Sequence, residues 1–99
     1  MKNQLSTSEI QQIVSNVTKI SVSDIISKSR KAEIVQARHL SMYFSRFNTN
    51  QNLLTIANQH GKDNHATVIH ACSAIHFEKR SNVSLAEKFQ TIENLVKNS

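Results

Sequence analysis

The chain has 99 residues, a length that allows one hydrophobic core but not two. It contains no proline and a single glycine, which argues against a sheet-rich fold because sheets depend on these residues at their turns. The net charge is +5 and the pI is about 9.7, so an anionic partner is expected: DNA, RNA or an acidic membrane surface. We predict one all-α domain over residues 1–99, with its core between residues 7 and 97.

The sequence also limits the compartment. A lone Cys72 cannot form an intramolecular disulfide. The polar start MKNQLSTSEI lacks the apolar stretch of a signal peptide, and no apolar run approaches the ~18 residues of a membrane span. We therefore expect a soluble, cytoplasmic protein.

Two short helices are predicted first. Ser6 and Glu9 have capping-box spacing before an apolar repeat, which predicts a helix ending near Lys19. Ser21 and Asp24 repeat this spacing and predict a second helix to about residue 27.

A longer helix is predicted from about Lys31 to Phe47. Its core face is expected to hold Ile34, Ala37, Leu40, Phe44 and Phe47. The opposite face is expected to be exposed and basic, with Arg30 at the entrance and Lys31, Arg38 and Arg46 in line.

The next segment predicts a helix-turn-helix. A short helix, LLTIANQ, capped by Asn50 or Asn52, is expected to bury Leu53, Ile56 and Ala57. Gly61 would turn the chain by adopting a positive φ. A second helix over 65–79, capped by Asp63 or Asn64, would bury Val68, Ala71, Cys72 and Ile75 and project His65, Ala66 and Thr67 toward a major groove.

The last of about six predicted helices spans residues 84–97. Its apolar side chains recur at helical spacing and are expected to close the core: Leu85, Phe89, Ile92, Leu95 and Val96.

Two segments resemble one family. SKSRKAEIVQARHLSMYFSR and HGKDNHATVIHA are similar to the C-terminal DNA-binding domain of the bacterial chromosomal replication initiator DnaA. The most specific part is the signature H-x-T-V-[IL]-H-A, which reads His65 to Ala71 here, and Arg30, Arg38, Met42 and Tyr43 also match family positions. The resemblance covers about residues 10 to 96.

This resemblance implies a Trp-repressor-like helix-turn-helix that binds double-stranded DNA without catalysis, in replication initiation or its regulation. It implies that Arg30 enters a minor groove and that residues 64–67 face the major groove. A narrow minor groove attracts arginine, and a helix N-terminus offers N–H groups to phosphate. The expected DNA-contacting residues are Lys28, Arg30, Lys31, Arg38, Lys62, Asp63, Asn64, His65, Ala66 and Thr67.

The chain departs from the family signature G-G-R-D-H-T-T-V at the turn. Asp63 replaces an arginine, Asn64 an aspartate and Ala66 a threonine. An amide can pair with adenine where a carboxylate cannot, so we expect DNA binding with an altered sequence preference. A chain with one glycine cannot contain the phosphate loop of an ATPase, and no cofactor is expected. We expect a free-standing, nucleoid-associated relative rather than an excised domain.

Three alternatives accompany this hypothesis. Cys72 and His76 share metal-ligand spacing, but no second pair accompanies them, so core packing of Cys72 is preferred and no metal is expected. Arg38 could pair with Glu33, Asp24 or Asp63 instead of phosphate. The whole domain could also keep the fold as a protein-interaction module that no longer reads DNA.

Overall fold

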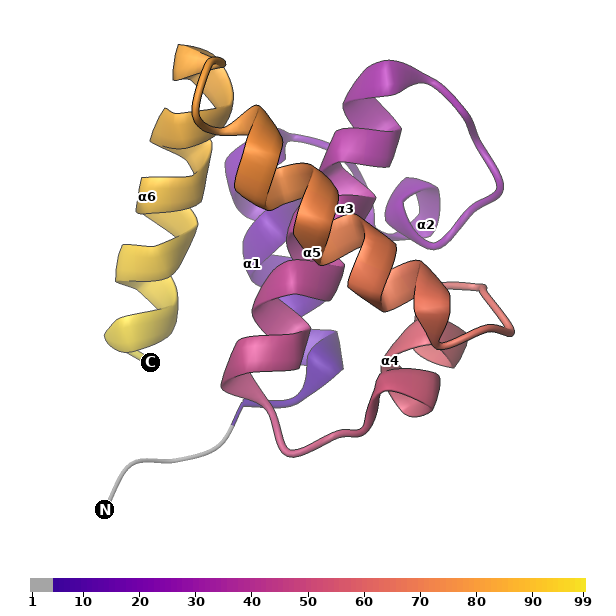
Figure 1. Cartoon of the computed structure of the whole chain (residues 1–99). Coiled ribbons are helices and arrows are strands. Elements are labelled where there is room, and N and C mark those ends of the chain that lie inside the picture. Colours follow the sequence, from indigo (N-terminus) through magenta and orange to yellow (C-terminus); the bar gives the residue numbers. More distant parts are fainter. Residues whose placement is uncertain (1–4) are drawn as a thin grey trace.

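Six helices and no strand form the described part of the chain, residues 5–99, in this computed structural model (Figure 1). The all-α prediction is confirmed. Residues 1–4, where the polar N-terminal stretch begins, lie outside the described residues. In chain order the helices are α1 (Thr7–Thr18), α2 (Val22–Ile25), α3 (Ala32–Asn48), α4 (Leu53–Gln59), α5 (Ala66–Glu78) and α6 (Val83–Lys97).

Side-chain caps fix where most of these helices begin. Ser6 and Glu9 form the predicted capping box of α1, and Ser21 accepts from the Asp24 N–H at the start of α2. Asn52 caps α4 by accepting from the Thr55 N–H. The start of α6 is one residue earlier than predicted, because Asn82 accepts from the Leu85 N–H.

Helix α3 crosses the middle of the molecule and packs against all five other helices (Figure 1). With α1 and α6 it surrounds the main core. Figure 1 shows α6 along one side of the molecule and α5 running diagonally across α3. The buried apolar members of this core are Ile10, Val14, Ile25, Ala37, Leu40, Phe44, Ile75, Leu85, Phe89, Ile92 and Val96.

A second, smaller core lies where α3, α4 and α5 meet. Ala57 and Val68 are both fully buried there, as predicted for a small residue on the first helix and an anchor on the second. The remaining members are Met42, Ile56, Ala71 and Cys72. This small core holds the helix-turn-helix against α3.

Two predicted core residues are exposed. Phe47 is 58% exposed because it lies in the last turn of α3, where its ring packs against Tyr43 and the Arg46 guanidinium. Leu95 is 45% exposed because it points about 90° away from the direction shared by Leu85 and Val96. Both predictions are wrong.

Within residues 5–99, no helix has both the length and the apolar character needed to cross a bilayer.

Candidate nucleic-acid interface

The turn between α4 and α5 is closed by backbone hydrogen bonds around Gly61. Gly61 has φ +76°, as predicted, and its N–H donates to the Asn58 carbonyl. The Lys62 N–H donates to the Ala57 carbonyl at 2.9 Å. These bonds satisfy the last carbonyls of α4 in the manner of a Schellman motif and fix the direction in which the chain leaves the helix.

Gly61 also contacts a second segment, the end of α2. A Cβ atom at this position would lie 2.6 Å from the carbonyl oxygen of Ile26, closer than any side chain tolerates. The turn is therefore pressed directly against the start of the loop over residues 26–31, which carries Arg30. Only glycine permits both the positive φ and this approach.

Arg38 bonds the end of α2, directly before this loop. Its Nε donates to the Ile25 carbonyl at 2.7 Å, and its Nη2 lies 3.4 Å from the Asp24 carbonyl. The side chain is 5% exposed, and this burial lowers its pKa. The expectation that Arg38 lies on an exposed basic face is wrong, because α3 is covered on several sides by its neighbours and not along one stripe only.

His60 and Ser41 form a buried polar pair that the sequence analysis did not identify. The His60 Nδ1 donates to the Ile56 carbonyl at 2.8 Å, so its Nε2 accepts from the Ser41 hydroxyl at 2.7 Å. Burial lowers the pKa of His60 to about 4. This neutral histidine joins α4 to α3 immediately before the glycine turn.

Gln11 supplies a third polar link to α4. It is buried on α1, and its Nε2 donates to the Gln59 carbonyl at 2.8 Å. The signal that could have revealed these residues is their helical spacing: Gln11 lies three residues before buried Val14, and Ser41 lies four residues after buried Ala37.

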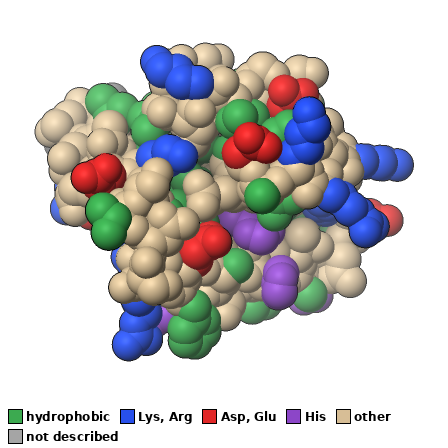
Figure 2. Space-filling view, turned by 90° about the horizontal axis from the view of Figure 1, so that it is seen from above, with side chains coloured by type: hydrophobic (Ala, Val, Ile, Leu, Met, Phe, Trp, Pro, Cys, Tyr) green, Lys and Arg blue, Asp and Glu red, His purple; other side chains and the backbone are tan. Residues whose placement is uncertain are grey.

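The loop and the turn carry exposed polar side chains on the same side of the molecule. Figure 1 shows the two loops at its right-hand edge, one above the other, and Figure 2 shows Lys and Arg side chains gathered toward the same edge. Lys62 and Thr67 are half-buried. The exposed residues of the loop and the turn are Lys28, Arg30, Lys31, Asp63, Asn64, His65 and Ala66. Together with Lys62 and Thr67 they form what we call the loop–turn surface.

His65 is the residue directly before α5, and Asn64, one of the two predicted caps, lies one residue earlier and bonds the first N–H of the helix. The Asn64 Oδ1 accepts from the Ala66 N–H at 2.8 Å, and its carbonyl accepts from the Thr67 N–H at 3.0 Å. The Val68 N–H donates to the His65 carbonyl. The N–H groups of Ala66, Thr67 and Val68 are therefore already bonded within the chain and are not free for phosphate.

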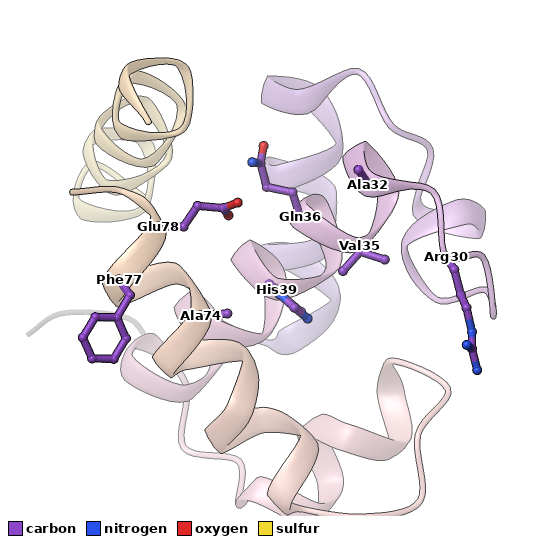
Figure 3. Close-up of a pocket in the computed structure, with 8 residues that line it drawn as sticks. All are labelled: Arg30, Ala32, Val35, Gln36, His39, Ala74, Phe77 and Glu78. Carbon is purple, nitrogen blue, oxygen red and sulfur yellow. The ribbon is translucent and has the colours of Figure 1, made fainter. Parts of the chain in front are cut away.

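A hollow of about 520 Å³ lies beside the loop–turn surface, between the N-terminal half of α3 and the C-terminal half of α5 (Figure 3). His39 and Val35 line its floor, while Phe77 and Glu78 stand on the α5 side. Burial and the nearby charges of His70, Arg38 and Lys62 lower the pKa of His39 to about 4. Arg30 stands at the opposite rim with its guanidinium extended from the loop (Figure 3).

The candidate metal-ligand pair, Cys72 and His76, has one residue in the core and the other on the surface. Cys72 is buried in the smaller core, where burial raises its pKa, while His76 is exposed next to Phe77. Among residues 5–99 no group of three or more His, Cys, Asp or Glu side chains could hold a metal ion.

The comparisons with known proteins agree on one family. Residues 7–75 match the family model described as the bacterial dnaA protein helix-turn-helix. The chain is 38% identical over 97 residues to the chromosomal replication initiator protein DnaA of Porphyromonas gingivalis, which covers 98% of this chain and 20% of that protein. The protein of the same name from Flavobacterium psychrophilum is 39% identical over 75 residues, covering 76% of this chain and 16% of that protein.

A third relative extends the match to another genus. The chromosomal replication initiator protein DnaA of Thermodesulfovibrio yellowstonii is 39% identical over 83 residues, covering 84% of this chain and 19% of that protein. The chain thus spans about a fifth of the length of the relatives it matches.

Proposed function

Because the chain belongs to the family of bacterial DnaA helix-turn-helix domains, we propose that it binds double-stranded DNA sequence-specifically through the loop–turn surface. In this proposal the start of α5 enters a major groove and Arg30 enters the adjacent minor groove. The relatives are named as chromosomal replication initiators, so we place the chain in replication initiation or its regulation. The role requires no catalytic residue and no cofactor.

The observation that carries the proposal is the close contact between the turn and the Arg30 loop. Gly61 lies against the Ile26 carbonyl, and Arg38 bonds the two carbonyls that precede it. A duplex presents its two grooves at a fixed separation, so a protein that reads both needs its two reading segments held at a fixed distance. Direct contact between the turn and the Arg30 loop fixes the distance between the two reading segments.

Charge supports the same assignment. Lys28, Lys31 and Lys62 flank the proposed base-reading residues and would neutralise phosphates. Asp63, His65 and Thr67 complete the turn beside the major groove. Arg38 is assigned a positioning role instead, because its guanidinium already bonds backbone carbonyls.

A duplex selection from random sequences, followed by affinity measurements at several salt concentrations, tests the proposal. Neutralising about four to six phosphates gives a slope of about −4 to −5 for the logarithm of affinity against the logarithm of salt concentration. Arg30→Ala and His65→Ala should weaken binding while leaving the free energy of unfolding nearly unchanged, because both side chains are exposed.

Lys97→Ala is a matched control, since it removes an exposed positive charge at the end of α6, away from the loop–turn surface. It should leave the affinity unchanged. A wild-type protein that selects no duplex, or a selected duplex bound equally well by the Arg30 and His65 variants, would contradict the proposal.

A further inference from the structure

Helix α1 is bonded to both ends of α4 by two polar side chains that lie one turn apart. Thr7 and Gln11 are four residues apart, so their side chains lie on the same face of α1, and both are buried. Their partners are Gln51, the residue before the Asn52 cap of α4, and Gln59, the last residue of that helix. The two links therefore bracket α4 from outside the helix-turn-helix.

The first link lies at the start of both helices. The Thr7 N–H belongs to the first turn of α1 and has no partner within that helix, and it donates to the Gln51 Oε1 at 3.1 Å. The Thr7 hydroxyl donates to the same oxygen. A backbone N–H can only donate, so the atom that faces it is the side-chain oxygen of Gln51. This link fixes the point at which the chain enters α4.

The second link lies at the end of α4. The Gln11 Nε2 donates to the Gln59 carbonyl at 2.8 Å, and because a carbonyl can only accept, the atom that faces it is the amide nitrogen. The two preceding carbonyls of α4 are bonded by the turn itself, through the N–H groups of Gly61 and Lys62. Gln11 therefore completes the bonding of the last three carbonyls of α4, directly before the turn.

We infer that α1 positions the turn between α4 and α5 for DNA, with Thr7 and Gln11 as the positioning residues; this inference rests on the proposed function. A helix held at one end can pivot about that end, whereas a helix held at both ends keeps its direction. Apolar contacts do not prevent such a pivot as hydrogen bonds do, because hydrogen bonds are directional. The turn is then fixed from two sides, by α1 and by the contact of Gly61 with the Ile26 carbonyl.

Gln11→Met tests the inference with a side chain of similar length that cannot donate a hydrogen bond. The Gln59 carbonyl loses its donor, and the affinity for the selected duplex should fall by about threefold to tenfold. The salt slope should keep its wild-type value, because no phosphate contact is lost. Gln12→Met is the matched control: it makes the same substitution one residue later, at an exposed side chain that bonds Asn16, and should leave the affinity unchanged.

Two further measurements separate a positioning role from a loss of stability. Val14→Ala removes buried apolar atoms from the same helix, so it should lower the free energy of unfolding and leave the affinity of the folded protein unchanged. Hydrogen exchange reports the turn directly. At the Gly61 and Lys62 N–H groups, exchange should become faster relative to the amides of α6 in Gln11→Met but not in Val14→Ala.

Gln51→Met releases the other end of α4 and should weaken binding by a similar factor. Gln51 is half-buried, so this variant decides the question if Gln11→Met does not fold.

The outcomes separate this inference from the proposed function. If wild-type protein binds its duplex and the Gln11 and Gln51 variants bind it equally well, the positioning role is wrong and DNA binding stands. If Val14→Ala weakens binding as much as Gln11→Met does, the loss reflects stability and the positioning role is again wrong. A wild-type chain that selects no duplex overturns the proposed function and this inference together.

Discussion

The two halves of this domain are held together by different kinds of interaction. Around α1 and α6 the core consists of apolar side chains, and its contacts have no required direction. Around the helix-turn-helix, buried polar side chains form directional hydrogen bonds: Arg38 bonds the Ile25 carbonyl at the end of α2, Gln11 bonds the Gln59 carbonyl of α4, and the Ser41 hydroxyl of α3 bonds His60. A hydrogen bond is directional, so it fixes where a loop lies as well as whether it is buried.

We therefore assign different roles to the two halves. The apolar half provides most of the stability, and the polar half sets the position of the loop–turn surface. Substitutions in the first half should therefore change stability alone, whereas those in the second half should change stability and duplex affinity together.

The largest loss of stability is expected from Leu85→Ala in the apolar half. Leu85 is fully buried on α6, so truncation leaves a cavity and should lower the free energy of unfolding by about 4 kcal/mol. Urea titration measures the loss. Leu95→Ala, on the exposed side of α6, should cost about 1 kcal/mol or less. Equal losses for the two variants would contradict the assignment of the core.

Gly61→Ala should cost about 3 kcal/mol and also weaken duplex binding. The added methyl group meets the Ile26 carbonyl at 2.6 Å and the backbone keeps a positive φ, so the turn and the Arg30 loop must separate. Urea titration and duplex titration report the two effects.

Lys19→Gly is the control for Gly61→Ala, because it makes the opposite substitution at Lys19, the other described residue with a positive φ, 65°. It should raise stability by about 0.5–1 kcal/mol and leave affinity unchanged. Normal duplex affinity in Gly61→Ala would show that the contact with Ile26 does not position the reading segments.

Arg38→Met should lower the free energy of unfolding by about 2 kcal/mol, because it removes a buried hydrogen bond to the Ile25 carbonyl and a partly buried one to the Asp24 carbonyl while keeping a long side chain. The salt slope of duplex binding separates a positioning residue from a phosphate contact. We expect the affinity to fall with the slope unchanged, whereas loss of a phosphate contact would reduce the slope by about 1.

The smallest effect is a pH dependence that belongs to the polar half. The pKa of His60 is about 4 in the folded chain against about 6.5 when unfolded, so the unfolded state binds more protons between these values. Stability should be constant above pH 7 and fall by about 1 kcal/mol between pH 7 and pH 5.5 from this residue alone. His39 adds a loss of the same sign.

The double variant Ser41→Ala/His60→Leu isolates this contribution, because it removes both members of the hydrogen-bonded pair and leaves neither unpaired. Its unfolding free energy should fall less steeply with acid than that of the wild type. An unchanged slope would mean that His60 is not neutral in the folded chain.

The sequence predicted the apolar half and the ends of the helices well, for identifiable reasons. Capping residues such as Ser6, Ser21 and Asn52 act within three residues along the chain, so spacing alone reveals them. Gly61 was identifiable because it is the only glycine. The second helix of the motif was predicted to within a residue of Ala66–Glu78 at each end.

The polar links were not predictable in this way. Arg38 was placed on an exposed face because a periodicity argument assigns one buried side to a helix, whereas α3 is enclosed on several sides. The partners of Arg38 and Gln11 are carbonyls 13 and 48 residues away, and a backbone carbonyl has no sequence signature. Which residues DNA contacts remains a prediction from the family resemblance and the exposed surface.

The central claim, that the loop and the turn form one surface for a duplex, is tested most directly by the salt dependence of duplex affinity in wild-type protein and in Arg30→Ala. We predict a wild-type slope of about −4 to −5, and for Arg30→Ala a weaker affinity with an unchanged free energy of unfolding. A flat salt response in the wild type, or an Arg30→Ala variant that binds as tightly as the wild type, would contradict the claim.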